Sequence, residues 1–513
     1  MLFNNKALLA LTVVFNLHAS EYQNANLKTF LKEFHENTKV VMNQLPYKKS
    51  IAKFSPFLKK DIENKNFVEA KDQIRKKFCK IEEGSEVCLD GLEGKAQIEA
   101  NDRASSMVEN GTALISNLAE MDAKNLHQKK VSKQPWSDDY WPIYAGILGK
   151  RYADLERGYT SDWKEAKNYV ELKPVSNYLE NNLTDLLSPS EKYDLLVGDN
   201  EGTLTKKMWE EGEEYYLKNG SVETWMGICH GWAPASYMLD RPTQKIAVMS
   251  VDQKTVVNFY PSDIKALGSL LWANAQTPSK FIGSRCNDKN PAVDESSGRI
   301  TDIKCFDTNP GTWHQTIVNQ IGVSDHSFIM DATFDYQVWN QPIISYNYKY
   351  FNVKTAETFT TWAEAKVKVK DYEEDKFKKY RNTKSKYFVG VEMSVVYLRE
   401  TTPNHTEINS EENDATNEVI YRYDLEVDAN GNIIGGEWYA NGHPDFMWTP
   451  AVSRATSYAD SYLNGEWASQ ISEQVYTGIP SDWSSYALSA SNYAMPLAKV
   501  VEGLILRSNE KRE

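Results

Sequence analysis

Helical patterns come early in this chain and strand patterns come late, and this order constrains the fold more than any other feature of the sequence. Beyond residue 135, the spacing of apolar residues predicts helices over 154–171 and 202–217. Alternating apolar and polar residues then predict strands over 245–259, 315–321, 327–333, 337–349 and 387–398. Helices followed by strands indicate an α+β domain with an antiparallel sheet, because a parallel sheet needs strands and helices that alternate along the chain.

The N-terminal residues are typical of an exported protein. Lys6 precedes a short apolar run that ends near Ala19, so residues 1–19 are predicted to be a cleaved signal peptide. No later segment is apolar over the ~20 residues that a transmembrane helix needs. The net charge of -13 argues against nucleic acid and against anionic membranes as partners. We therefore expect a protein that is secreted, periplasmic or at the cell surface.

Composition divides the remainder into three parts. Residues 20–134 are polar and rich in Lys and Glu, which predicts helices over 27–41 and 68–81. This part is either a cap or pro-region over the active part of the molecule, or a structural helical appendage. The α+β domain is expected over 135–450, followed by a helical extension over 451–513 that packs on the core.

The five cysteines fall as two close pairs and one alone. Cys79 with Cys88 and Cys286 with Cys305 are predicted to form disulfides, because an oxidising compartment permits them. Cys229 then remains as the free thiol, and it is either a nucleophile or an inert buried residue.

The residues after Cys229 favour a nucleophile. The run from Trp232 to Leu239 predicts a helix, and a thiol at a helix N-terminus has a lowered pKa. Gly231 leaves room for a substrate carbonyl, and Trp225 and Trp232 are candidates for the walls of a substrate groove. The sequence therefore predicts an activated thiol beside an aromatic groove.

A base for this thiol is expected among the histidines. Gly322-Val323 fits a two-residue hairpin turn between 315–321 and 327–333, and in that register His314 lies opposite Asp331, about 5 Å apart at Cβ. A carboxylate beside an imidazole orients it as a base, which predicts a Cys229, His314 and Asp331 constellation for acyl transfer. A slipped register would instead favour His326.

A hairpin is also predicted at 419–427 and 432–439, because Asn430-Gly431 is a strong turn signal. Residues 426–437 match the spacing of a calcium-binding EF-hand loop, except that Glu426 stands at the first position. Strands rather than helices flank this loop, so the hairpin is the preferred interpretation. Calcium is kept as a possible cofactor, and no other metal or cofactor is expected.

Several motifs in order resemble the oomycete elicitor transglutaminases, within the papain-like and transglutaminase superfamily. They are Gly-Ile-Cys-His-Gly-Trp-Ala-Pro around Cys229 and Tyr-Gln-Val-Trp-Asn-Gln-Pro at 336–342, together with the segments at 135–138, 435–438 and 443–446. The segment after Pro342 lacks the basic character of the oomycete elicitor sequence. The Asn/Lys-rich composition suggests a bacterial member.

The resemblance implies a papain-like core, with the cysteine helix packed on an antiparallel sheet, and a protein-glutamine γ-glutamyltransferase activity. Cys229 would form a thioester with a glutamine side chain, and a lysine or polyamine nitrogen would resolve it. Trp339 and Asn340, in the second motif, join the substrate-binding candidates, and Asn340 is also a candidate to orient the imidazole. A cysteine peptidase or amidase, and a non-catalytic aromatic-rich protein that binds a polymer or a receptor, remain as alternatives.

Overall fold

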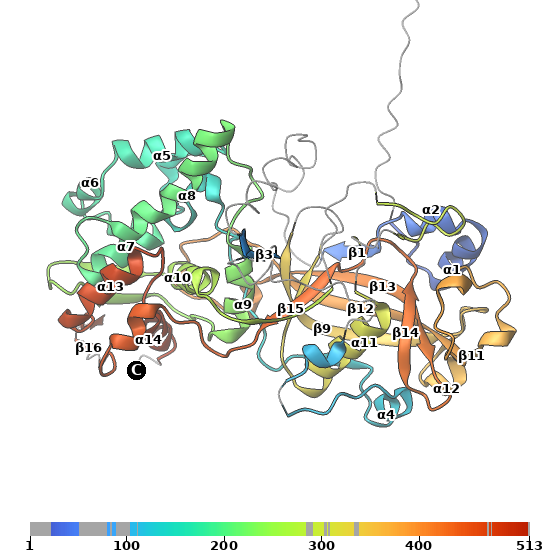
Figure 1. Ribbon diagram of the computed structural model, residues 1–513. Coiled ribbons are helices and arrows are strands. Elements are labelled where there is room, and N and C mark those ends of the chain that lie inside the picture. The colour runs from blue at the N-terminus through green and yellow to red at the C-terminus, as the bar shows by residue number, and fades with distance from the viewer. Residues whose placement is uncertain are drawn as a thin grey trace, which may run out of the picture.

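The computed structural model describes residues 22–50, 79–82, 85–88, 103–109, 111–283, 291–301, 305, 308–332, 338–468, 471–472 and 474–510. The predicted signal peptide and most of the predicted helix at 68–81 lie outside these residues. Helices and strands separate into a mainly helical part and a part built on a large antiparallel sheet, which lie side by side (Figure 1).

Most strands of the large sheet come from the second half of the chain. Its central path runs in the order β1-β13-β12-β9-β8-β15-β7, with β4 and β10 on β9, β11 on β12 and β14 on β13. The strands are β1 Tyr47–Ser50, β4 Gln128–Lys130, β7 Ser279–Gly283, β8 Ile329–Asp331, β9 Asn340–Phe351, β10 Thr358–Phe359, β11 Val367–Lys368, β12 Tyr387–Arg399, β13 Ala415–Val427, β14 Ile433–Trp438 and β15 Phe446–Pro450. Within the described residues, the strand pairs of this sheet are antiparallel, as the order of helices and strands predicted.

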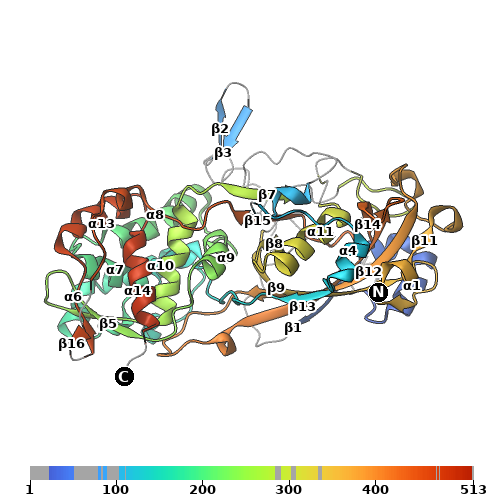
Figure 2. The ribbon, with the colours of Figure 1, turned by 90° about the horizontal axis from the view of Figure 1, so that it is seen from below.

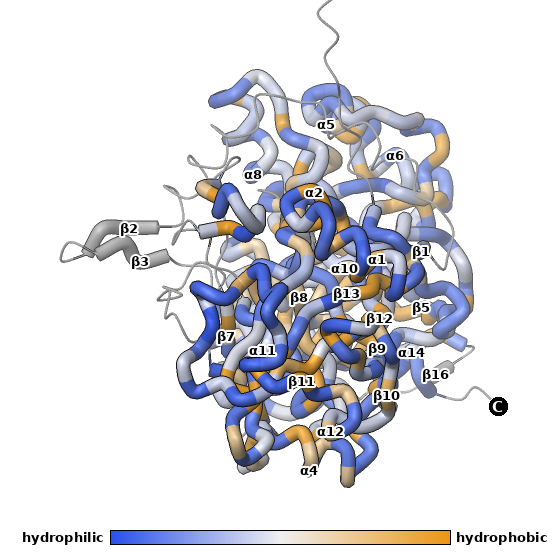
Figure 3. Tube along the Cα trace, turned by 90° about the vertical axis from the view of Figure 1, so that its right-hand side faces the viewer, coloured by the Kyte–Doolittle hydropathy of each residue, from blue (hydrophilic) through white to orange (hydrophobic). Residues whose placement is uncertain are grey.

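The long strands form where the sequence alternates. Along β12, Val389, Val391, Met393 and Val395 are buried, and they enter one apolar core together with residues of β9 and β13. The hydrophobic colour in Figure 3 follows these central strands, whereas the surrounding loops are largely hydrophilic. The predicted hairpin is confirmed: β13 pairs with β14, and Gly431 in the turn has a φ of 89°, which glycine adopts without strain.

Helices make up the other part. They are α5 Trp163–Leu172, α6 Val175–Glu180, α7 Pro189–Val197, α8 Thr203–Asn219, α9 Cys229–Met238, α10 Pro261–Asn274, α13 Ser484–Ser491 and α14 Ala498–Ser508. A small sheet, in the order β16-β17-β5-β6, lies among them, with β5 Ile246–Met249, β6 Val256–Phe259, β16 Ile471–Ser472 and β17 Val475–Tyr476. Figure 2 shows α14 beside α10, so the C-terminal residues do pack as helices on the core.

Local sequence signals fix the ends of these helices. In α7, the Ser188 side chain accepts from the Glu191 backbone while the Glu191 carboxylate accepts from the Ser188 backbone. Pro189 stands in the first turn, where its missing N–H costs nothing, and Gly198 ends the helix in a left-handed conformation.

The N-terminal residues that the structure describes pack on the large sheet. They include α1 Leu27–Glu36, α2 Thr38–Met42 and α4 Leu118–Ala123, and the predicted helix at 27–41 is thus found as α1 and α2. Phe34 of α1 is buried, and its ring stacks on Tyr439 with centroids 4.4 Å apart. β1 also pairs with β13 and β4 pairs with β9. These segments are therefore integrated into the core of the sheet.

Two sequence predictions need correction here. Residues 315–321 are helical rather than extended, because α11 Pro310–Ile317 continues as a π-helical turn over Val318–Val323. The physical reason is that Trp313, Ile317 and Ile321 recur every four residues and enter the apolar core together, which is helical spacing. The last residues of the predicted helix at 68–81 are also extended rather than helical, because the strand β2 begins at Cys79.

Cys79 and Cys88 lie directly opposite each other on the paired strands β2 Cys79–Glu82 and β3 Ser85–Cys88. Cys305 is buried, and its predicted partner, Cys286, lies outside the described residues. Both disulfides stay predictions. The remaining short elements are α12 Trp362–Ala365 and 3₁₀ turns at Ala104–Ser106, Ile143–Ala145, Ile147–Gly149, Leu155–Arg157, Thr184–Leu186, Val369–Asp371, Lys378–Tyr380, Glu411–Asn413, Tyr458–Tyr462 and Ser481–Trp483.

Candidate active site

The free thiol lies at the start of a buried helix. Cys229 is the first residue of α9, and the Trp232 N–H donates to the Ile228 carbonyl, 3.1 Å away, to close the first turn. A Cβ at Gly231 would come within 2.3 Å of the Ser269 carbonyl of α10. Gly231 therefore allows α9 and α10 to pack closely, and this use differs from the predicted one of admitting a substrate carbonyl.

The start of β9 and the residues just before it supply the contacts of the thiol. The Asn340 side-chain amide donates to Cys229 Sγ over 3.6 Å, and the thiol itself donates to the Val338 carbonyl over 3.9 Å. The Trp448 indole N–H donates to Asn340 Oδ1 over 2.8 Å. Because the indole N–H can only donate, it fixes the amide with its NH₂ group toward the sulfur.

Burial raises the pKa of Cys229 to about 11, although a helix N-terminus was expected to lower it. The Asn340 amide opposes this rise, whereas the negative charges of Glu400 and Asp331 add to it. Loss of hydration and two nearby carboxylates thus outweigh the helix dipole. The resting group is a thiol, and its attack on a substrate requires a base.

Asp331 belongs to this site. It is buried at the end of β8, and its partner across the strands is Asn340 of β9. Side chains of directly opposed residues lie on the same face of a sheet, so Asp331 faces the side on which Asn340 meets the thiol. The Trp339 backbone N–H donates to Asp331 Oδ1 over 3.1 Å. The predicted association of Cys229 and Asp331 is thus compatible with the structure.

His314 does not lie opposite Asp331 as predicted, since it is in α11. Its Nδ1 is 2.8 Å from the Tyr423 hydroxyl, and its ring centroid is 4.7 Å from that of Tyr348. Tyr348 lies eight residues beyond Asn340 on β9, which corresponds to about 26 Å along the strand. Burial also lowers the pKa of His314 to about 3. The structure therefore separates His314 from the thiol.

His326, the alternative base, also lies elsewhere. Its ring meets that of Tyr237 edge-on at 5.4 Å, and Tyr237 is eight residues beyond Cys229 on α9, about 12 Å along the helix axis. His326 Nδ1 is 3.3 Å from the Gln320 amide. Among the described residues, neither predicted imidazole is placed beside Cys229.

The predicted aromatic wall is formed in part. Trp232 is fully buried, and its indole N–H donates to the Trp136 carbonyl over 3.0 Å, so Trp232 is a core residue rather than a groove residue. Trp225 is partly buried, and its indole N–H donates to the Glu223 carboxylate over 3.0 Å. Trp339 is the tryptophan that lines a cavity next to the site.

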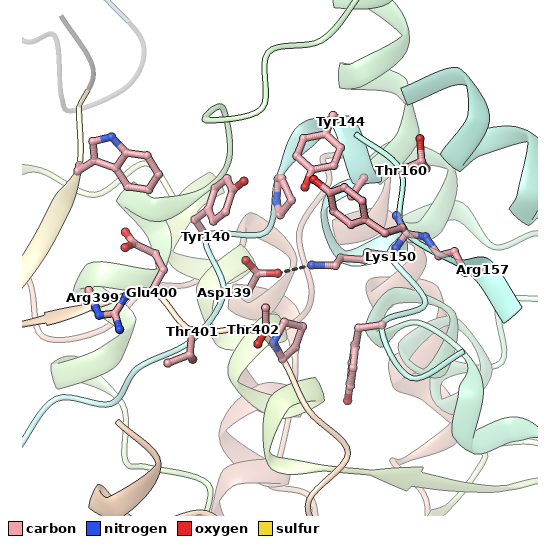
Figure 4. A pocket seen from close by; sticks show the side chains of 16 residues that line it. Asp139, Tyr140, Tyr144, Lys150, Arg157, Thr160, Arg399, Glu400, Thr401 and Thr402 are labelled. Carbon is pink, nitrogen blue, oxygen red and sulfur yellow. Dashed lines mark hydrogen bonds and ion pairs between the residues drawn. The ribbon is translucent and has the colours of Figure 1, made fainter. Parts of the chain in front are cut away.

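This cavity encloses about 210 Å³ between the helical part and the sheet (Figure 4). Trp339 lies in its wall, and the residues on either side of Trp339 in the chain, Val338 and Asn340, are those that contact the thiol. The full lining is Asp139, Tyr140, Pro142, Tyr144, Ala145, Lys150, Tyr152, Arg157, Tyr159, Thr160, Trp339, Arg399, Glu400, Thr401, Thr402 and Pro403. Five of these sixteen residues are aromatic and five are charged, so the cavity combines ring faces with charged groups.

Glu400 was not foreseen from the sequence. It follows β12, and its carboxylate accepts from the Gln341 amide over 2.7 Å. Burial raises the pKa of Glu400 to about 7. No motif marks this residue, and only the pairing of β12 with β9 brings it beside the thiol. The segment at 135–138, which carries part of the family resemblance, leads directly into the cavity residues Asp139 and Tyr140.

The candidate calcium loop has internal partners. Asp428 Oδ1 accepts from the backbone of Asn430 and Asn432, whereas Glu437 forms an ion pair of 2.7 Å with Arg299. Within the described ranges, no group of three or more His, Cys, Asp or Glu side chains is arranged to hold a metal ion. A calcium requirement stays a prediction.

None of the helices in the described ranges combines the length and the apolar character that a membrane span needs. The model of the transglutaminase elicitor family matches residues 110–463. The crystal structure of the GP42 transglutaminase from Phytophthora sojae is similar with a TM-score of 0.46 and 20% sequence identity, over 74% of this chain and 95% of that chain. No curated protein matches the sequence.

Proposed function

The chain belongs to the transglutaminase elicitor family, and from this premise we propose that it is a protein-glutamine γ-glutamyltransferase with Cys229 as its nucleophile. The observation that carries the proposal is the placement of the free thiol at the start of α9, beside the Asn340 amide and on the face of the sheet that Asp331 shares. A thiol, a hydrogen-bond donor and a carboxylate are the parts that acyl transfer through a thioester requires.

In the first half of the reaction, Cys229 Sγ attacks the side-chain carbonyl carbon of a substrate glutamine. Asp331 accepts the thiol proton and then donates it to the amide nitrogen, which leaves as ammonia. The carbon–nitrogen bond breaks as the carbon–sulfur bond is completed, leaving a thioester on Cys229. Asp331 thus takes the role that the sequence assigned to His314.

Asn340 supports the sulfur as it loses its proton. Its N–H donates to Sγ, and a hydrogen bond to the charged form favours that form. The backbone N–H of Cys229, at the start of α9, faces the position where the oxyanion develops in this proposal. In the second half of the reaction, a lysine or polyamine nitrogen attacks the thioester and releases the thiol.

The direct test is incorporation of a labelled primary amine into a glutamine-rich protein, with ammonia release measured in parallel. Wild-type protein is expected to do both and to show the mass of an acyl adduct on Cys229 when amine is withheld. The C229A variant is expected to lose both, whereas S236A, a substitution on the same helix, is expected to keep them. Assays with and without EDTA test the calcium requirement.

Two outcomes would replace the proposal. Cleavage of peptide bonds without amine incorporation would assign the chain as a cysteine peptidase or amidase. Binding of a polymer or receptor that is equal in wild type and C229A, with no turnover in either, would assign a non-catalytic protein.

A further inference from the structure

A partly buried carboxylate and an aromatic pair line the cavity near the thiol. The rings of Tyr140 and Trp339 lie 5.7 Å apart, tilted by 59°, and both residues line the cavity. Glu400 lines the same cavity, and its charge acts on Cys229 more strongly than that of any other carboxylate. The cavity therefore approaches the thiol at its Glu400 end.

Charge is distributed unevenly along the cavity. Figure 4 shows Glu400, Arg399 and Tyr140 toward one end and Arg157, Tyr144 and Thr160 toward the other. Between them, Lys150 forms an ion pair of 2.5 Å with Asp139, so this lysine is neutralised within the wall. The end next to the thiol thus presents aromatic faces and the Glu400 carboxylate, which attract a protonated amine, together with the Arg399 guanidinium.

We propose that this cavity is the site through which the acyl-acceptor amine reaches the thioester, and that the Glu400 carboxylate accepts the proton of that amine. This inference rests on the proposed function, because it concerns the second half of the same reaction. The acceptor class is a primary amine on an unbranched alkyl stem, as in a lysine side chain or a polyamine. The stem packs along the surface that the rings of Tyr140 and Trp339 form together in the cavity wall.

The acceptor enters as an ammonium ion and loses one proton to Glu400, which frees the nitrogen lone pair to attack the thioester carbonyl carbon. A carbon–nitrogen bond forms and the carbon–sulfur bond breaks. The departing sulfur takes a second proton from the nitrogen, which leaves an isopeptide bond and the free Cys229 thiol. Glu400 then releases its proton to solvent.

The groups that face Glu400 suit this role. Gln341 of β9 donates to its carboxylate, Arg399 favours its ionised form, and Asp139 disfavours that form. The charge of Glu400 also acts on the Cys229 thiol and raises its pKa. Burial, with a contribution from Asp139, outweighs Gln341 and Arg399 and raises the pKa of Glu400 to about 7, so near neutral pH the side chain can both accept and release a proton.

The test compares two acceptors with the E400Q variant. A lysine peptide is protonated at pH 7.5 and needs a base, whereas hydroxylamine is already neutral at that pH and does not. E400Q is expected to incorporate the lysine peptide about 100-fold more slowly than wild type, since a general base typically contributes a factor of about that size. Hydroxamate formation is expected to remain close to wild type. E412Q, at an exposed glutamate, is the matched control.

Hydroxamate formation also shows that the variant is folded and still forms the thioester. Equal losses with both acceptors, or no loss with either, would overturn the role of Glu400 while leaving the proposed function intact. Wild-type protein that releases no ammonia and forms no acyl adduct would overturn the proposed function itself, and this inference with it.

Discussion

The surroundings of Cys229 hold its proton on the sulfur, and one side chain works against this effect. Burial raises the pKa of the thiol, and Glu400 and Asp331 raise it further, whereas the Asn340 N–H lowers it. Asn340 is itself held by the Trp448 indole. The amide therefore acts as the activating partner of the sulfur in the described part of the site.

Replacing Asn340 with Ala is expected to raise the pKa of Cys229 further, because the opposing hydrogen bond is lost. The rate of thiol alkylation by iodoacetamide at pH 8 should fall about tenfold for each unit by which the pKa rises. N347A, at an exposed position on the same strand, is the control. An alkylation rate in N340A equal to that of wild type would mean that the contact has no effect on the thiol.

Trp339 separates the cavity from the residues that contact the sulfur. The W339A variant is expected to favour water over amine as the acceptor, because the thioester becomes better hydrated and the amine loses an aromatic wall. The ratio of glutamine deamidation to amine incorporation should rise, measured by mass spectrometry of one substrate peptide. W362A, in α12 on the large sheet, should leave the ratio unchanged. A ratio in W339A equal to that of wild type would contradict this role.

At the scale of elements, α11 supports the sheet and carries His314 into its core. His314 contacts Tyr423 of β13 and Tyr348 of β9, and its neighbour Trp313 is fully buried. α11 packs on β14 and β13, and His314 meets β9 at Tyr348, eight residues beyond Asn340. The helix is therefore a packing element of the sheet.

The H314Q variant is accordingly expected to be less stable than wild type near pH 7 and to incorporate amine at the wild-type rate. Folded His314 has a pKa of about 3, below its ordinary value of 6.5, so the unfolded chain binds an extra proton between these values. The free energy of unfolding of wild type therefore falls as the pH drops below 6.5, by up to about 1.4 kcal/mol per pH unit.

Thermal unfolding of both proteins from pH 7 to pH 5 checks the effect of His314. The difference in stability between wild type and H314Q should shrink toward pH 5, since the variant lacks the titrating group. Loss of amine incorporation in a folded H314Q protein would instead restore His314 as the base.

At the scale of the whole molecule, a buried ion pair joins the helical part to the sheet. Arg241, which follows α9, donates to both carboxylate oxygens of Asp414 over 3.0 and 2.6 Å, and Asp414 directly precedes β13. Arg241 also donates to the Pro135 carbonyl over 3.2 Å. The helix that carries the thiol is thereby fixed relative to the sheet that carries Asn340.

R241Q is expected to lose about 3–5 kcal/mol of unfolding free energy, because it leaves the buried Asp414 carboxylate unpaired. Adding D414N should recover part of this loss by removing the uncompensated charge. K245Q, which breaks an ion pair with the largely exposed Glu407, should cost at most about 1 kcal/mol. Denaturant unfolding gives the unfolding free energy of wild type, R241Q, R241Q/D414N and K245Q. Equal stability of R241Q and K245Q would contradict the role of the Arg241–Asp414 pair.

Features that depend on local pattern could be predicted from the order of residues alone. The order of helices before strands predicted the mixed fold with an antiparallel sheet, and Asn430-Gly431 predicted the β13–β14 hairpin. The spacing of the cysteines identified Cys229 as the free thiol. These signals are legible because turn chemistry, amphipathic period and residue spacing act over a few residues.

Which distant residues meet at the thiol depends on how the strands and helices assemble. Residues 315–321 satisfied a strand pattern over seven residues, yet they pack as a helix because Trp313, Ile317 and Ile321 share one buried face. Asn340 and Glu400 reach Cys229 only through the pairing of β9 with β8 and β12. Strand order and burial are properties of the assembled core, and burial also reversed the expected direction of the Cys229 pKa, since desolvation outweighed the helix terminus.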